Sequence, residues 1–430
     1  MSTLRYKICL FCLLACLPLS ALDIDYRLSM RAGMILPDGK VDATVNKKGQ
    51  WIGPSAGGEF AVSFHPEWQS LREWNGACIG AALSYWKLDA TLTGDKDLLG
   101  HSIAPYIFVE IPFYKSSHFE IGARPGFGCA FITKTYFNTA TPEQQYNVLQ
   151  EDGINQSVGS VTNYFFPEAI YLNFLIRKGW TIGLAGGWYH MSNGSTIQPN
   201  SGYNIFCGEL NVRYRPEDEH AEKAGTQEKA TKELGLAALR AHHCEVEFGV
   251  ACAARQVYYK DRQTFFCSDI QMAAYWRAHR IFRLGGGVDI FYDGAYYDRP
   301  TLFGKTYLRG ATQADCWRVG VSVQPEFVMG YFSLGIHLGV YLYDPVKNRE
   351  VSKDDKAAYD DLWINGHMPN KGVFYSYDLL KAGSGGYPDG WFYTRIAAKY
   401  HLPYHLFVQA SIKVHLTKVE FIGAGLGVYL

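Results

Sequence analysis

The clearest pattern in the chain is a pair of alternating segments between Thr181 and Arg215, separated by a stretch rich in Asn, Gly, Ser and Pro. Because side chains alternate across a strand, such a pattern predicts an antiparallel hairpin with one apolar and one polar face. We expect the charged face to contact water and the apolar face to contact lipid or a core. In the second segment the apolar face holds Asn204, Phe206, Gly208, Leu210, Val212 and Tyr214, and the other face holds Glu209, Asn211, Arg213 and Arg215.

Three polar residues fall on the apolar face near the tip of this hairpin: His190, Ser192 and Asn204. If the hairpin is symmetric about Ile197, His190 pairs directly with Asn204, with Cβ atoms about 5 Å apart. His190 and Ser192 are two residues apart on one strand, which places their Cα atoms about 6.5–7 Å apart on the same face. The sequence therefore predicts that an imidazole, a hydroxyl and an amide meet at the tip.

The same alternation recurs along the whole chain and predicts an all-β fold of about sixteen antiparallel strands. The segments are roughly 23–35, 58–66, 76–89, 99–113, 117–133, 158–176, 179–192, 202–215, 243–256, 264–278, 281–293, 316–329, 331–344, 390–400, 404–415 and 417–430.

Short turns alternate with long polar loops between these segments, which is typical of an outer-membrane β-barrel. Residues 216–241 interrupt the rhythm with a charged, Ala-rich stretch, which we interpret as a helical connector on the short-turn, periplasmic side. We predict an N-terminal half at 22–215 and a C-terminal half at 242–430 of one barrel; the alternative is two eight-stranded barrels. A weak similarity between residues 183–194 and 283–294 is compatible with duplication.

Composition supports a secreted β protein. Of 430 residues, 48% are hydrophobic and 19% charged, with 30 Tyr, 25 Phe and 44 Gly and a formal net charge of zero, so no affinity for nucleic acid is implied. Beyond the N-terminus no apolar run is long enough for a transmembrane helix. Residues 1–21 have the basic, apolar and small-residue order of a signal peptide; a lipoprotein signal at Leu13–Cys16 is the alternative.

The cysteines give no sign of a metal centre or a disulfide framework. Seven follow the signal, mostly inside apolar segments, and none has the spacing of a zinc ligand set. We interpret them as small buried or lipid-facing residues, and we predict neither a metal nor a cofactor.

The three residues at the hairpin tip have the chemistry of a hydrolytic serine. Ser192 would be the nucleophile, His190 its base and Asn204 the group that orients the imidazole, while Asn193 and Gly194 are the nearest oxyanion donors. A His-x-Ser pair on a strand is by itself usually structural, and the alternative is a polar network that closes the loop. The lipid-facing position favours function, because an unpaired polar group in hydrocarbon costs several kcal/mol.

These residues carry a family resemblance. His190 to Gly194, followed by Pro199 to Asn204, resembles the motif of the PagL-type outer-membrane lipid A 3-O-deacylases, which are serine esterases. Longer Bacteroidetes proteins called acyloxyacyl hydrolases are similar also around 283–293, 411–415 and 418–422. The resemblance implies catalysis by Ser192 and His190, with Asn193 and Gly194 on the oxyanion side. The short enzymes have Glu where this chain has Asn204, and Glu209 is a poor substitute because it points to the opposite face.

We therefore expect an outer-membrane serine esterase that removes an ester-linked acyl chain from lipid A of lipopolysaccharide. The competing interpretation is a non-enzymatic barrel, porin-like or structural, that retains the hairpin; a sixteen-stranded barrel is wide enough for a channel. A third is a surface-binding protein that uses the long loop at 345–389. The acyl position and the oligomeric state are not encoded in these patterns.

Overall fold

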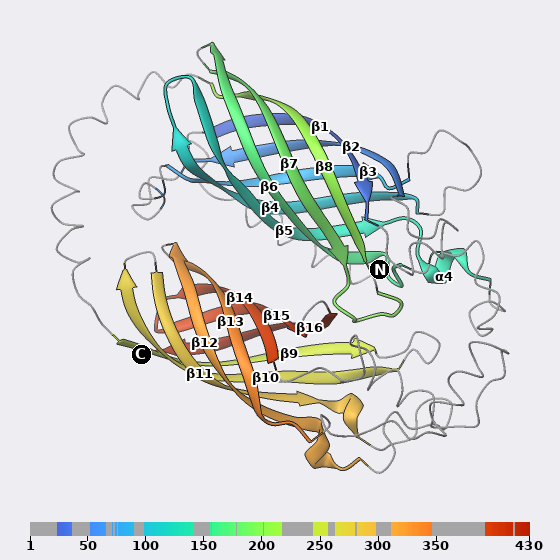
Figure 1. Ribbon diagram of the computed structural model, residues 1–430, viewed down its shortest axis with the longest axis vertical. Coiled ribbons are helices and arrows are strands. Elements are labelled where there is room, and N and C mark those ends of the chain that lie inside the picture. Colours follow the sequence, from blue (N-terminus) through green and yellow to red (C-terminus); the bar gives the residue numbers. More distant parts are fainter. Residues whose placement is uncertain are drawn as a thin grey trace.

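The sixteen strands form two separate antiparallel barrels in the computed structural model, which covers the 430-residue chain (Figure 1). The residues that the structure describes are 24–36, 52–65, 71, 74, 76–89, 99–141, 155, 157–177, 179–200, 202–216, 244–256, 263–279, 282–297, 311–329, 331–345, 392–415 and 418–430.

The first barrel closes in sequence order, with β1 paired to β8. A short helix, α4 (Tyr136–Thr139), lies in the connection between β5 and β6. The strands are β1 (Ile24–Ile35), β2 (Ile52–Phe64), β3 (Cys78–Lys87), β4 (His101–Lys115), β5 (Phe119–Ile132), β6 (Thr162–Arg177), β7 (Trp180–Ser192) and β8 (Tyr203–Tyr214).

The second barrel closes in the same way, with β16 paired to β9. Two short 3-10 helices, η3 (Gly294–Tyr296) and η4 (Gln313–Cys316), lie between β11 and β12. The strands are β9 (Cys244–Gln256), β10 (Thr264–His279), β11 (Phe282–Asp293), β12 (Trp317–Met329), β13 (Phe332–Tyr343), β14 (Phe392–Leu402), β15 (Leu406–His415) and β16 (Lys418–Tyr429).

The all-β prediction and the sixteen segments are confirmed, and the alternative of two eight-stranded barrels is the one that forms. The single wide barrel is wrong because β8 pairs with β1 instead of β9. The similarity of 183–194 to 283–294 joins the seventh strand of one barrel to the third of the other, so it does not relate equivalent strands. The predicted signal peptide, most of the connector at 216–241 and the loop at 346–389 lie outside the described residues.

The outer walls of both barrels are apolar, as a lipid-facing wall requires. On β7 and β8 the outward side chains include Leu184, Trp188, Phe206 and Leu210, which are 37–53% exposed. None of the helices in the described segments has the length and apolar character needed to cross a membrane. The described cysteines are all free; Cys244 and Cys252 lie on the outer wall, and four others are buried.

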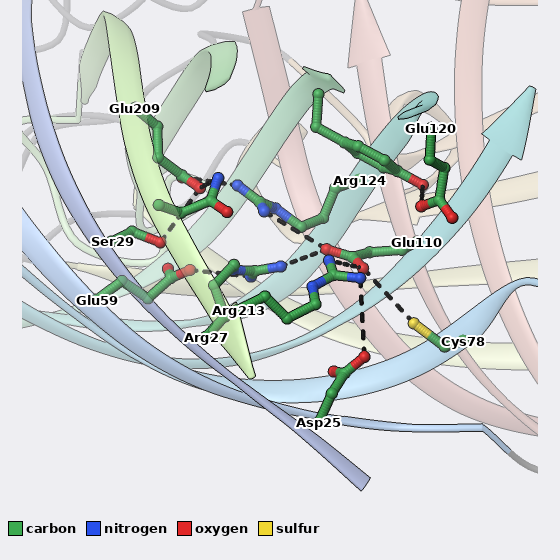
Figure 2. A network of polar contacts seen from close by, with 12 residues as sticks. Asp25, Arg27, Ser29, Glu59, Cys78, Glu110, Glu120, Arg124, Glu209 and Arg213 are labelled. Carbon is green, nitrogen blue, oxygen red and sulfur yellow. Dashed lines mark hydrogen bonds and ion pairs between the residues drawn. The ribbon is translucent and has the colours of Figure 1, made fainter. Parts of the chain in front are cut away.

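The charged faces of the strands point into the barrels, where they pair with one another. In the first barrel the buried Arg27 contacts both Glu59 (3.1 Å) and Glu110, and Arg124 contacts Glu209 at 2.6 Å (Figure 2). Glu209 is 4% exposed. The expectation that the charged face of the hairpin contacts water is therefore wrong, because a small closed barrel directs that face onto the charges of the opposite strands.

The second barrel has a comparable interior. Arg283 contacts Glu326 at 2.8 Å, Lys399 contacts Glu247 at 2.6 Å, and Arg395 contacts Asp269 at 2.6 Å. Eight strands give an interior that side chains fill, whereas water-filled channels occur in wider barrels. The porin-like interpretation depended on one wide barrel, so this architecture removes its basis.

Candidate active site

The site lies at the end of β7 and the start of β8, where a ten-residue connection joins them. His190 and Asn204 are directly paired across these strands, as symmetry about Ile197 predicted. Both lie on the outward face together with the exposed Trp188 and Phe206. Alternation thus places the polar tip of the hairpin on the lipid-facing side, at the end of the barrel that bears the long loops.

Ser192, His190 and Asn204 form one hydrogen-bonded chain. His190 Nδ1 lies 2.8 Å from Asn204 Oδ1, and His190 Nε2 lies 2.8 Å from Ser192 Oγ. A carbonyl oxygen only accepts, so Nδ1 carries the proton and donates to Asn204. The unprotonated Nε2 then accepts from the hydroxyl of Ser192. This is the tautomer that a general base needs.

Glycine at position 202 permits the close return of the second strand. Gly202 has φ +74, and a Cβ there would stand 2.9 Å from Ser192 Cβ and 3.2 Å from His190 Cε1. Its N–H donates to the carbonyl of Ser157 at 3.0 Å, which ties the hairpin to the β5–β6 connection. A larger residue would displace the serine or the imidazole. Gly202 therefore sets the separation on which the chain of hydrogen bonds depends.

Asn193 and Gly194 were the predicted oxyanion donors, and the structure distinguishes them by the hydrogen bonds that their N–H groups make. The backbone N–H of Asn193 donates to Asn200 Oδ1 (2.8 Å), and its side-chain amide donates to Ser160 Oγ (2.9 Å) and to the carbonyl of Ile197 (2.6 Å). All donors of Asn193 thus hold the loop together. The N–H of Gly194 has no acceptor among the described residues, so of the two only Gly194 keeps an unengaged backbone donor.

The glutamate that the short deacylases have at the position of Asn204 is not replaced by another carboxylate next to His190. Glu209 lies inside the barrel, 2.8 Å from Arg31 and 2.6 Å from Arg124, which confirms that it faces away from the site. Both nitrogens of His190 are already engaged by Ser192 and Asn204. The imidazole is thus oriented by an amide, which fixes its geometry but cannot stabilise imidazolium by charge.

A groove runs over the outer wall next to the site. Its volume is about 690 Å³, and its floor includes Gly186 and Gly208, which are paired on adjacent strands. A Cβ added at either glycine would meet nothing within 4 Å. Trp188, one alternation step from His190, also lines the groove, and Glu168 is the charged residue among the lining. The groove reaches Trp188 and Phe206, each two residues from a member of the polar chain on its own strand.

Access to the site comes from the lipid-facing side. His190 and Asn204 are partly exposed, whereas Ser192 is only 3% exposed. Outward-facing aromatic residues flank the pair, since Phe166 is the β6 partner of His190 and Tyr164 that of Ser192. An ester must therefore approach over the imidazole and along the aromatic wall.

Sequence reasoning missed the residues that hold the loop. Ser160 and Asn200 accept from Asn193, and only Asn200 lies within the motif that was singled out. Ser160 is thirty-three residues away and carries no local signal. The peptide bond before Pro199 is cis. No group of three His, Cys, Asp or Glu side chains in the described part of the chain could hold a metal ion.

Comparison with known families bears on the second barrel. Residues 244–362 match the family model described as the C-terminal domain of acyloxyacyl hydrolases. The predicted resemblance to this family is confirmed for that segment. The matched segment contains β9 to β13, whereas the Ser192–His190–Asn204 chain lies in the first barrel.

Several solved structures of outer-membrane barrels are similar to the chain. Neisserial surface protein A is 10% identical, with a TM-score of 0.26, over 45% of this chain and 97% of its own. The outer membrane enzyme PagL is 17% identical, with a TM-score of 0.25, over 43% of this chain and 97% of its own. A mutant porin of Rh. blastica is 10% identical, with a TM-score of 0.17, over 95% of this chain and 100% of its own. No curated protein sequence matches the chain.

Proposed function

We propose that the protein is an outer-membrane serine esterase that removes an ester-linked acyl chain from lipid A of lipopolysaccharide. The observation that carries the proposal is the continuous hydrogen-bonded chain of Ser192, His190 and Asn204 on the lipid-facing wall, next to the long loops. The acyl chain of a membrane lipid already lies beside such a wall, so the site needs no deep pocket. The groove beside Trp188 supplies an apolar surface for that chain.

The proposed reaction has two steps. Ser192 Oγ attacks the ester carbonyl and passes its proton to His190 Nε2, and the oxyanion is stabilised by the N–H of Gly194. The C–O bond to the sugar breaks, and His190 returns the proton to the leaving alkoxide. A water then attacks the acyl-serine with His190 again as base, which releases the fatty acid and restores Ser192.

One feature favours a second interpretation, a structural barrel that retains the hairpin without turnover. Asn204 occupies the place of the acid, and loss of that charge slows a histidine-assisted reaction by orders of magnitude. The same experiment separates the two functions, because a structural barrel leaves lipid A unchanged.

The test is incubation of the purified full-length chain with lipid A, followed by mass spectrometry. We expect a product lighter by one hydroxyacyl group, and no product with Ser192→Ala. Ser268→Ala is the matched control, because Ser268 is an outward-facing serine in a strand of the second barrel. Turnover by Ser192→Ala at the wild-type rate would exclude Ser192 as the nucleophile, and no mass change with any form would exclude the esterase.

A further inference from the structure

The turn that carries the proposed oxyanion donor has an unusual backbone. Gly194 and Ser195 have φ values of +63 and +65, and Thr196 N–H donates to the carbonyl of Asn193 at 3.3 Å. Two consecutive residues with positive φ are characteristic of type I′ turns. For Ser195 this conformation carries a steric cost, so other contacts must hold it.

Those contacts come from the second barrel. Gln256, at the end of β9, donates its backbone N–H to the carbonyl of Ser195 at 2.7 Å, and its side-chain Oε1 accepts from the N–H of Gln198 at 3.1 Å. Ser195 Oγ donates to the carbonyl of Val419, in β16, at 3.1 Å. Gln256 therefore holds the turn from both ends.

The turn also packs on the outer wall of the second barrel. A Cβ at Gly194 would stand 2.5 Å from Ile422 Cδ1, so the glycine backbone rests directly on that side chain. By strand alternation Ile422 shares the outward face with Leu426, which is 66% exposed, yet Ile422 is 8% exposed. Gln256 is likewise an outward position at 8% exposure, while Cys252 on the same face is exposed. The first barrel covers these two positions.

The two barrels meet with like ends together. Gln256 ends β9 and Val419 is the second residue of β16, so both lie at the long-loop end of the second barrel, as does the turn in the first barrel. At the short-turn ends, Trp74 and Phe327 contact edge to face with ring centroids 6.1 Å apart. The arrangement suits two barrels that cross one membrane in the same sense.

We infer that the second barrel is a positioning element of the active site: Gln256, Val419 and Ile422 hold the 193–198 turn so that the N–H of Gly194 faces the reacting carbonyl. This inference rests on the proposed esterase. An oxyanion donor acts only if it is fixed before the reaction. The first barrel holds Asn193, the residue before Gly194, and Gln256 of the second barrel holds Ser195 and Gln198 after it. A second barrel without the serine–histidine pair thereby gains a role in the reaction.

The experiment uses the full-length double variant Gln256→Ala/Ile422→Ala, which removes the side-chain acceptor and the packing surface. We expect a kcat at least tenfold lower with KM within about threefold, because the turn affects the transition state more than substrate binding. We expect Ser192 to react more slowly with a fluorophosphonate, and the amides of residues 194–198 to exchange hydrogen at least tenfold faster. Gln256→Glu keeps an acceptor for Gln198 and should restore most of the kcat that Gln256→Ala loses.

Leu426→Ala is the matched control, because it truncates an exposed aliphatic residue on the same strand as Ile422. It should behave as wild type in all three measurements. Unchanged exchange at 194–198 in the double variant would overturn the contact, and unchanged kcat despite faster exchange would overturn its role in positioning. If the wild-type protein leaves lipid A intact, the proposed function fails, and the positioning role fails with it. Hydrogen exchange still reports whether the second barrel holds the turn, so failure of the esterase is distinguished from failure of the contact.

Discussion

The equivalent hairpins of the two barrels, β7–β8 and β15–β16, share their fold and differ in chemistry. In the first barrel the outward positions next to the loop are His190, Ser192 and Asn204, and the strands are joined by ten residues. In the second barrel the outward positions include the aliphatic pair Ile412 and Ile422, and only two residues separate the strands. One hairpin carries the hydrogen-bonded chain, and the other presents an apolar wall on which the loop of the first rests.

This difference shows how a barrel wall can be specialised without a change of architecture. Both interiors contain dense ion pairs, so the interior is the shared structural part. The outer rim is where the two diverge, because an outward side chain makes few contacts that the fold depends on. Four changes test how far the division between a reactive hairpin and a supporting one extends.

The largest effect is expected for His190→Ala. Without the imidazole, Ser192 has no base and the proton of the attack has no acceptor, so kcat should fall by about three orders of magnitude or more. The measurement is the initial rate of fatty acid release from lipid A. Val408→Ala, on the outward face of β15, should leave the rate within about twofold. A loss of less than tenfold for His190→Ala would contradict the role of His190 as the base, and with it the chemical difference between the two hairpins.

The second effect concerns stability. Glu209→Leu leaves Arg31 and Arg124 without their shared carboxylate in the barrel interior, and breaking a buried pair costs about 3–5 kcal/mol. We expect the variant in lipid vesicles to unfold at a lower urea concentration, as measured by the midpoint of the change in tryptophan fluorescence. Activity per folded molecule should change by less than about threefold, because Glu209 has no contact with His190.

Leu210→Ala changes the next residue on the lipid-facing side and should shift the midpoint far less. A large loss of activity in folded Glu209→Leu would instead return Glu209 to the catalytic chain.

The sequence predicted the strands and the chain of three residues because both depend on local spacing. Alternation fixes which residues share a face, and symmetry about Ile197 fixes the pairing of His190 with Asn204. Closure was not predictable in this way, since the free edge of β8 offers the same backbone groups to β1 as to β9. One feature of the sequence does indicate closure within the first half. The buried charged residues in the described part of the first barrel are four arginines and four carboxylates, so this half of the chain balances its interior charges by itself.

The supports of the site were beyond local reasoning for the same reason. Ser160, Gln256 and Ile422 act on the loop from distant segments, and their spacing in the sequence carries no information about that contact. Residues 418–422 belong to the family resemblance, and the structure places Ile422 of this segment against Gly194.

A third prediction concerns the amide. Asn204→Glu places a carboxylate opposite His190 Nδ1, where it stabilises the imidazolium that forms during attack, so kcat should rise by about tenfold or more. Asn204→Ala removes the orienting partner and should lower kcat by about tenfold or more. Both are read from initial rates at neutral pH. A fall in kcat for folded Asn204→Glu would show that this hairpin is built around a neutral partner.

The smallest effect is expected in the groove, and it decides whether the wall of the first barrel binds the acyl chain. Gly208→Leu fills the floor of the groove from a position where an added Cβ meets no atom within 4 Å, so we expect the variant to fold. We expect kcat/KM on a long-chain ester to fall by about tenfold, while a short-chain ester soluble in water is cleaved at the wild-type rate. Ala424→Leu, at an outward position of the second barrel, is the matched control and should alter neither. Equal losses on both substrates would place the defect at Ser192 and leave the groove without a role in chain binding.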